Sequence, residues 1–397
     1  MRDQTLTLAQ FRETKIMRVT LVRDIKGLAG LRDQWQPLLN RCRPNHVFMT
    51  WEWFFAWWKH FMQGRELFVL VVQDKGEIIG ILPLMLFILP KEQIKLRYLH
   101  FIGFRFEQAW NDWIDIIAVR KGEVIRAALE YLKTRQYLWD YLDLWQIPED
   151  SDTLAIISDL APRAGFSFEK QPVATCPYLP TTSNWETYYH ASSLKRARGD
   201  IERQIRRLGA RGKLEVQWIE AANLVVDLES FFDLYERRWT ALNQRAMFSQ
   251  EVYRNFYRTL AQVFPRELLD CSFLKLDGRV IAAHFGFRYN HKLYLCTPTF
   301  DPDYAEFGPG KILLRYMIEN CFADPSIHEF DFLAGSEAYK FQWATGERRS
   351  CRILIANAYS AGLAGRVLRR VPLHIRRPMV GGLRMLGYMR RGFAKAE

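Results

Sequence analysis

The sequence lacks the cysteine and histidine patterns of a metal-binding or disulfide-bonded protein. Its six cysteines form no CxxC pair and have no regular spacing, and no His/Cys cluster has the spacing of zinc ligands. We therefore expect reduced, mostly buried thiols in a cytoplasmic protein without a bound metal. The cysteines are Cys42, Cys176, Cys271, Cys296, Cys321 and Cys351.

Long apolar runs are also missing. The longest, Ile78–Leu89, has 12 residues and contains Pro83, which is too short to span a bilayer. The N-terminus shows no apolar region of the secretory type. The expected location is cytoplasmic, at most peripheral at the inner face of a membrane.

Three familiar catalytic motifs are absent. The stretch Phe307–Lys311 contains Gly308, Gly310 and a lysine, but a P-loop would need glycine at 305 and Ser or Thr at 312, where the chain has alanine and isoleucine. Neither GxGxxG nor the GxSxG elbow occurs. The first absence removes P-loop nucleotide hydrolysis from consideration.

Basic charge is concentrated at the C-terminus. Nine Arg or Lys and one acid lie in residues 361–397, which hold +8 of the net charge of +12. Because apolar residues alternate with these cations, two interpretations stay open: basic amphipathic helices on an anionic membrane surface, or a helix packed on the body.

The chain repeats a pattern at an offset of about 200 residues. Residues 48–87 and 248–287 each begin with an aromatic-rich segment preceded by Thr50 or Ser249, which suit helix capping. Each then carries Arg-Glu-Leu and two apolar runs joined by a tight turn, Asp74-Lys75-Gly76 or Asp277-Gly278-Arg279. We interpret this as duplication of a helix followed by a β-hairpin.

At 397 residues the chain is long enough for two domains. Strands alternate with helices after each hairpin, which predicts an α/β fold with a mixed sheet. The expected divisions are a disordered extension (1–16), a first domain (17–180), a second domain (181–360) and the C-terminal segment (361–397). A linker containing Pro172, Pro177 and Pro180 would join the domains.

A basic amphipathic helix is expected after this linker. Ser192 or Ser193 would cap it, and apolar residues at helical spacing would continue to Leu208. Its other faces carry Lys195, Arg196, Arg198, Arg203, Arg206 and Arg207. A solvated face is the ordinary interpretation, and a surface for phosphate or nucleic acid is the alternative.

The stretch Phe307–Ile312 is the candidate phosphate site. A strand ends near Thr297, and glycines then open an apolar helix, where free amides and the helix dipole favour anions. The candidate binding residues are Phe307, Gly308, Gly310, Lys311 and Ile312, of which Lys311 adds a positive charge. An ordinary tight turn is the alternative.

Polar residues follow the next expected strand, His328–Leu333, where α/β folds place their chemistry. Tyr339 can protonate a leaving thiolate, and Lys340 can hold a phosphate or oxyanion. Glu337 and His284 complete the catalytic candidates. His284 interrupts an apolar strand, where it is either a functional group or a core histidine with satisfied hydrogen bonds.

Together these motifs resemble the GCN5-related N-acetyltransferase (GNAT) superfamily. They are most similar to its double-domain branch, the CelD-like proteins of cellulose and exopolysaccharide loci and the Fem-type peptidyltransferases. The resemblance covers about residues 47–343. It is carried by the 277–278 turn, the 307–314 loop and helix start, Phe330-Asp331-Phe332 with Gly335, and Tyr339-Lys340 with Trp343.

The resemblance implies tandem acyltransferase domains with central strands that diverge around acetyl- or acyl-coenzyme A. The pyrophosphate would lie on the Gly308–Ile312 amides, and Tyr339 would occupy the position of the usual acid. The loop departs from the family's glycine pattern. The first domain has no matching loop, so we expect it to be structural or to bind the acceptor.

The leading interpretation is transfer of an acyl group from acyl-coenzyme A to a small amine, of amino-sugar or amino-lipid type, in polysaccharide or cell-envelope biosynthesis. Two alternatives stay open. One is a Fem-type transferase that uses aminoacyl-tRNA, for which the basic helix is the motivation. The other is a catalytically degenerate scaffold in a polysaccharide-synthesis assembly.

Overall fold

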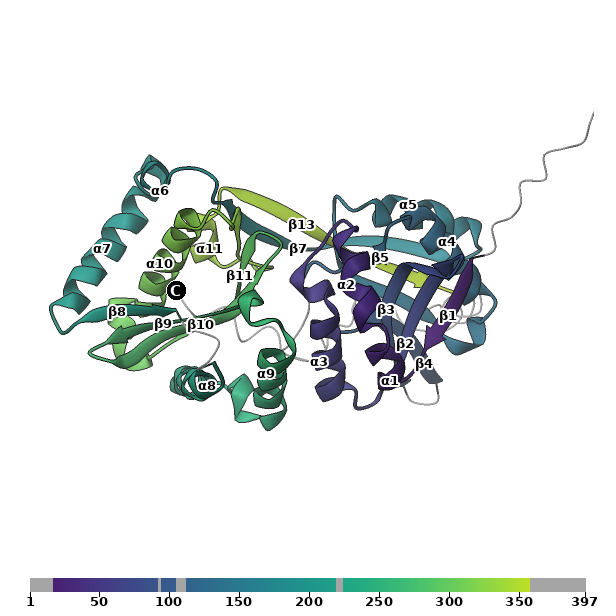
Figure 1. The fold of residues 1–397 in the computed structure, drawn as a ribbon, viewed down its shortest axis with the longest axis horizontal. Helices are drawn as coiled ribbons and strands as arrows, with labels where there is room; N and C mark the ends of the chain where they lie inside the picture. The colour runs from purple at the N-terminus through teal and green to yellow at the C-terminus, as the bar shows by residue number, and fades with distance from the viewer. Residues whose placement is uncertain (1–16, 92–93, 105–111, 219–223, 358–397) are drawn as a thin grey trace, which may run out of the picture.

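The computed structural model describes residues 17–91, 94–104, 112–218 and 224–357. In this part the chain forms two halves of similar design, joined by one continuous sheet (Figure 1). The predictions made for residues 1–16 and 361–397 lie outside the described residues. No helix among those described is long and apolar enough to cross a membrane.

The first half lies on the right of Figure 1. Its elements are β1 (Arg18–Val22), α1 (Ile25–Ala29), α2 (Arg32–Asn40), α3 (Trp51–Phe61), β2 (Arg65–Asp74), β3 (Glu77–Lys91), β4 (Ile94–Phe101), β5 (Ile117–Ala118), α4 (Lys121–Lys133), β6 (Tyr141–Pro148), α5 (Asp152–Arg163) and β7 (Ser167–Pro180).

The second half lies on the left. Its elements are α6 (Trp185–Tyr189), α7 (Lys195–Gly209), β8 (Leu214–Trp218), α8 (Leu224–Ala241), α9 (Glu251–Val263), β9 (Leu269–Leu276), β10 (Arg279–Tyr289), β11 (Lys292–Phe300), α10 (Pro309–Ala323), β12 (Glu329–Asp331), α11 (Ala338–Trp343) and β13 (Gly346–Ala356). A 3₁₀ segment, η6 (Pro302–Phe307), precedes α10.

The sheet confirms the mixed α/β fold. Its strand order is β1-β2-β3-β4-β6-β13-β7-β12-β11-β10-β9-β8, with β5 paired to β3 outside this path. The two halves therefore have the same strand order counted from the outer edges of the sheet. One edge begins with β1, β2, β3, β4 and β6, and the other begins with β8, β9, β10, β11 and β12. Most neighbours are antiparallel, but β4–β6 and β11–β12 are parallel.

Both predicted hairpins are present at corresponding places. Lys75 and Gly76 connect β2 to β3 with φ of 50° and 89°, and Asp277 and Gly278 connect β9 to β10 with φ of 48° and 83°. Two successive positive φ values match the right-handed twist of the strands. The repeated turn sequence thus has a repeated structure.

The two halves share their central strands. β13 pairs with β6 of the first half, β7 pairs with β12 of the second, and β7 and β13 pair with each other over most of their length. Figure 1 shows both strands running between the halves. The expected domain boundary after residue 180 coincides with the end of β7, and the division into two domains stays a prediction.

The expected proline-rich linker is wrong, because all three prolines lie in β7. Proline fits a strand at a bulge or a strand end, where no ladder hydrogen bond is lost. Pro172 lies at a register shift opposite Cys351, and Pro180 is the last residue of the strand. The carbonyl of Pro177 still accepts a hydrogen bond from the Phe332 amide at 3.1 Å.

Of the expected helix caps, only Thr50 is confirmed. Its side chain accepts a hydrogen bond from the Trp53 amide at the start of α3. Ser192 and Ser193 instead form a 3₁₀ turn before α7. Ser249 precedes the N-cap position of α9, and its hydroxyl donates to the Ala246 carbonyl at 2.8 Å.

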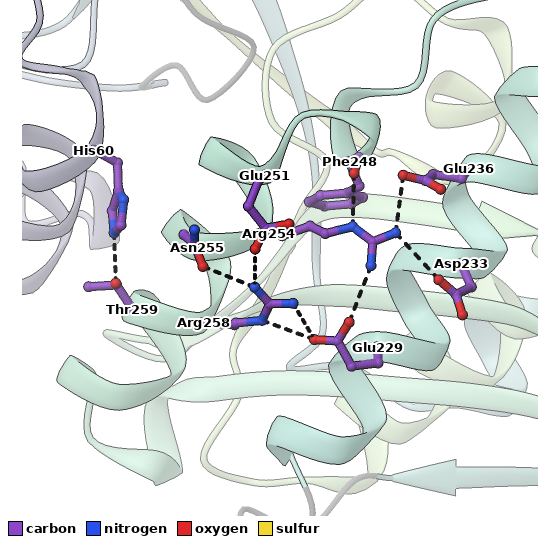
Figure 2. Close-up of polar contacts among 10 residues, drawn as sticks. All are labelled: His60, Glu229, Asp233, Glu236, Phe248, Glu251, Arg254, Asn255, Arg258 and Thr259. Atoms are coloured by element: carbon purple, nitrogen blue, oxygen red, sulfur yellow. Dashed lines mark hydrogen bonds and ion pairs between the residues drawn. The ribbon is translucent and has the colours of Figure 1, made fainter.

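One apolar core extends through both halves. It includes α3 of the first half and α8 and α9 of the second. α3 packs on α9, where Trp53 meets Phe256 edge to face at 5.4 Å. Figure 2 shows His60 Nε2 beside the Thr259 hydroxyl, at 2.7 Å. A second core lies under α7 and α10, on the other face of the second half.

Ion pairs fasten α9 to α8. Glu229 of α8 accepts hydrogen bonds from Arg258 at 2.7 Å and Arg254 at 3.2 Å, and Arg254 also reaches Asp233 and Glu236 (Figure 2). Both arginines contact the Phe232 ring. The helix pair that covers this face of the second half is therefore held by charge as well as by packing.

Candidate functional site

The candidate site begins where β11 and β12 separate. Only the segment Lys292–Tyr294 of β11 pairs with β12, over Glu329–Asp331. Beyond this point β11 continues to Phe300, whereas the chain turns away after β12 at Leu333, whose φ is 59°. The carboxyl ends of two parallel strands therefore diverge, which is where open α/β sheets bind ligands.

A β-bulge shapes β11 at this place. Its register against β10 shifts between Thr297, opposite Phe285, and Tyr294, opposite Phe287. Gly286 lies at the bulge, where a Cβ atom would stand 2.2 Å from the Tyr294 carbonyl oxygen. Only glycine permits this close approach of the two backbones.

His284 lies behind the bulge and has no exposed surface. Its Nε2 accepts a hydrogen bond from the Cys296 amide at 3.3 Å, and its Nδ1 lies 3.4 Å from Asp270 Oδ1. Burial raises the pKa of Asp270, but His284 and Arg288 outweigh it and the net pKa is lowered. In this structure His284 supports the bulged backbone from inside the core.

The glycine loop opens α10 as expected. Gly308 is the N-cap residue with φ of 57°, and Pro309 follows as the first helical residue. Proline has no amide hydrogen, and the Lys311 and Ile312 amides donate to the Gly308 carbonyl at 2.9 and 3.1 Å. The Gly310 amide and the exposed Lys311 side chain are therefore the main groups here for an anion.

Cations of α7 and of the turn that follows it flank this loop. Arg207 and Arg211 lie over the buried Phe307 ring at 4.9 and 4.5 Å, and Arg207 also pairs with Glu306 at 3.0 Å. A Cβ atom on Gly308 would stand 2.6 Å from Gln204 Oε1. The loop thus packs closely on the basic helix, while the Ile312 side chain belongs to the core.

The other catalytic candidates lie on the turn into α11. Lys340 is buried and donates to the Ala334 carbonyl at 2.9 Å, and its Nζ lies 3.1 Å from Glu337 Oε2. Gly335, with φ of 148°, leaves room for this pair, since a Cβ atom there would overlap Glu337. Lys340 therefore fixes the turn rather than presenting a free ammonium group.

Tyr339 is half-buried against the second core, within reach of the charges of Glu337 and Arg238. Burial, and then the charge of Glu337, raises the pKa of its phenol, while Arg238 lowers it in part. The phenol therefore stays protonated at neutral pH. Its chemistry is that of a hydrogen-bond donor.

Arg238 is a residue that the sequence reasoning missed. It extends from α8, donates to the Pro298 carbonyl at 3.2 Å and lies over the Phe300 ring at 4.2 Å. Phe300 in turn lies against Gly310, whose Cβ position would be 3.3 Å from the ring. Arg238 thereby connects the tyrosine, the end of β11 and the start of α10, and no local sequence motif marks it.

The first half repeats part of this geometry. β4 and β6 are parallel only over Tyr98–His100 and Tyr141–Asp143. Asp143 therefore corresponds to Asp331 of the second half, and each lies near a buried histidine, His100 Nδ1 at 3.8 Å and His46 Nε2 at 4.0 Å.

An arginine of β13 completes each of these pairs, Arg352 at Asp143 and Arg348 at Asp331. Burial lowers the pKa of both histidines, that of His100 to about 4. No glycine loop accompanies the first-half pair in the described residues.

The described residues contain no cluster of three or more His, Cys, Asp and Glu side chains suited to a metal ion. The six cysteines are free thiols, and burial raises the pKa of each.

Residues 195–341 match the family model described as acetyltransferase (GNAT) domain. The matched segment runs from the start of α7 into α11 and includes the bulge, the glycine loop and Tyr339. The chain thus carries a GNAT-type domain with an acyltransferase-like fold. No curated protein matches the chain.

Solved structures share the fold over most of the chain. FemX is 12% identical with a TM-score of 0.54, covering 80% of this chain and 95% of FemX. A conserved protein of unknown function from Bacteroides thetaiotaomicron is 13% identical (TM-score 0.54; 85% and 100% covered).

The C-terminal domain of a putative lysylphosphatidylglycerol synthetase from Agrobacterium fabrum is 10% identical (TM-score 0.52; 85% and 94% covered). At these low sequence identities, the similarity shows a shared fold and nothing further.

Proposed function

We propose that the second half transfers an acyl group from acyl-coenzyme A to an amine. The observation that carries this proposal is the divergence of β11 and β12 at the bulge, with the glycine loop on one side and Tyr339 on the other. The family match to residues 195–341 supports it. An amino-sugar or amino-lipid acceptor, a role in polysaccharide or envelope synthesis, and the CelD-like branch are narrower parts of the same proposal.

In the proposed reaction the amine nitrogen attacks the thioester carbonyl and the carbon–sulfur bond breaks. Glu337 is partly exposed and takes the proton of the amine. Tyr339 donates a hydrogen bond to the departing sulfur. Because its pKa is raised, complete proton transfer to a thiolate with a pKa near 8.5 is unfavourable.

Isothermal titration with acetyl-coenzyme A and longer acyl forms tests the donor. We expect Lys311→Gln to weaken binding about tenfold, as for the loss of one charge-assisted contact. Lys133→Gln, at an exposed lysine near the end of α4, is the matched control. If no acyl form binds in the millimolar range, the donor assignment fails and a scaffold role is favoured.

The second candidate is a Fem-type transfer from aminoacyl-tRNA. The exposed side chains of Lys195, Arg196 and Arg206 on α7 favour it, because clustered cations bind phosphate backbones. Filter binding of charged tRNA at two salt concentrations decides this. Absence of retention at low salt would exclude the candidate.

A membrane role for residues 361–397 is a separate proposal, supported by their basic and apolar composition. Co-sedimentation with anionic vesicles should be lost when these residues are deleted. Unchanged co-sedimentation would show that the segment is not the anchor.

A further inference from the structure

Arg238 carries a half-buried charge that no acid balances in the part of the chain described. Its contacts are the Pro298 carbonyl and the Phe300 and Trp239 rings, and its Nε has no hydrogen-bond partner. The adjacent Arg237, by contrast, pairs with Asp301 and Asp303. Arg254 of α9 pairs with three carboxylates (Figure 2).

Such an arrangement leaves N–H donors available to a ligand, because a guanidinium has five of them and one carbonyl accepts here. Partial removal of the guanidinium from water costs free energy that this carbonyl and two rings offset only in part. The groups that face it, Tyr235 and Tyr339, are neutral phenols, and burial lowers the pKa of Arg238. Charged groups whose pKa is shifted by desolvation cluster at functional sites.

Arg238 does not contact the glycine loop itself, because the Phe300 ring lies between its guanidinium and Gly310. α8 covers one face of the second half, with Phe231 and Phe232 in the core shared by both halves. α7 and α10 cover the other face (Figure 1), and Arg207, Arg211 and Lys311 flank the loop there. An acyl-coenzyme A donor with its phosphates at the loop would therefore be neutralised by these cations, without Arg238.

We propose that Arg238 binds an oxyanion of the acceptor, so that the acceptor is an amine that also bears a phosphate or carboxylate group. A guanidinium suits both groups, because its parallel N–H donors match two oxygens. Tyr339 then lies beside the bound acceptor. This inference rests on the proposed transfer reaction for the identity of the ligand as an acceptor.

Titration calorimetry on the full chain with coenzyme A present tests the inference. The probes are O-phosphoethanolamine, β-alanine and the uncharged match, ethanolamine. We expect at least one anionic probe to bind about tenfold or more tightly than ethanolamine, and the stronger of the two identifies phosphate or carboxylate. Arg238→Gln should remove this preference and leave coenzyme A binding unchanged.

Arg245→Gln, at an exposed arginine just after α8, should keep both properties. Equal binding of charged and uncharged probes, or an unchanged preference in Arg238→Gln, overturns the inference. So does a loss of coenzyme A binding in Arg238→Gln as large as in Lys311→Gln, since Arg238 would then serve the donor. If coenzyme A does not bind but the Arg238-dependent preference persists, the anion site stands and the proposed reaction fails.

Discussion

The ion pair between Arg352 and Asp143 should hold β13, the last strand of the second half, to β6 of the first half. Arg352 Nε and Nη2 lie 2.6 and 2.7 Å from the two carboxylate oxygens of Asp143, and the side chains are only 8% and 2% exposed. Arg352 also lies over the Trp145 ring at 4.8 Å. One buried contact thus joins residues 209 positions apart.

Replacing Arg352 with methionine leaves the carboxylate buried without its partner. Two charge-assisted hydrogen bonds at about 1.5–3 kcal/mol each, and measured losses on breaking buried pairs, give an expected cost of roughly 3–5 kcal/mol. The double variant Arg352→Met/Asp143→Leu should recover most of this loss, because neither charge is then buried alone.

Urea unfolding followed by tryptophan fluorescence measures these changes. Arg207→Met is the matched control, because the Arg207–Glu306 pair has a similar distance of 3.0 Å but is 48% and 61% exposed. Its expected cost is below about 1 kcal/mol. If Arg352→Met lowered the free energy of unfolding no more than Arg207→Met, the buried ion pair would not be what holds β13 to the first half.

Three further predictions concern stability. Because the pKa of His100 is lowered to about 4, the unfolded chain binds the proton first as pH falls below 6.5. The wild type should therefore lose about 2 kcal/mol more than His100→Gln between pH 7.5 and 5, and parallel urea-unfolding profiles would contradict this. Gly286→Ala should cost about 3 kcal/mol through overlap with the Tyr294 carbonyl, whereas Gly122→Ala, which meets nothing within 4 Å, should be neutral or stabilising. Equal melting temperatures for the two alanine variants would show that the bulge tolerates a Cβ atom. Glu229→Gln should lower stability by about 1 kcal/mol, because the carboxylate is 44% exposed, and a larger loss in thermal unfolding would mean that α8 and α9 depend on this charge more than exposure suggests.

The sequence alone determined the local elements. Turns at Asp74-Lys75-Gly76 and Asp277-Gly278-Arg279 could be recognised because positive φ values restrict which residues fit, and the repeat predicted two similar halves. The start of α10 at the Gly308-Pro309-Gly310 stretch was predictable for the same reason. Such features depend on neighbours in the chain, so the sequence contains them.

Tertiary structure decided which residues meet. In the sequence the prolines of β7 look like a linker, because proline is uncommon inside a strand. A strand accepts proline where no ladder hydrogen bond is lost, and the pairing of β7 with β12 and β13 decides where that is. Lys340 looks like a free cation until the turn brings the Ala334 carbonyl and Glu337 to it. Arg238 has no motif, and its significance comes from the absence of a nearby acid among the described residues, which only the packing of α8 on β11 reveals.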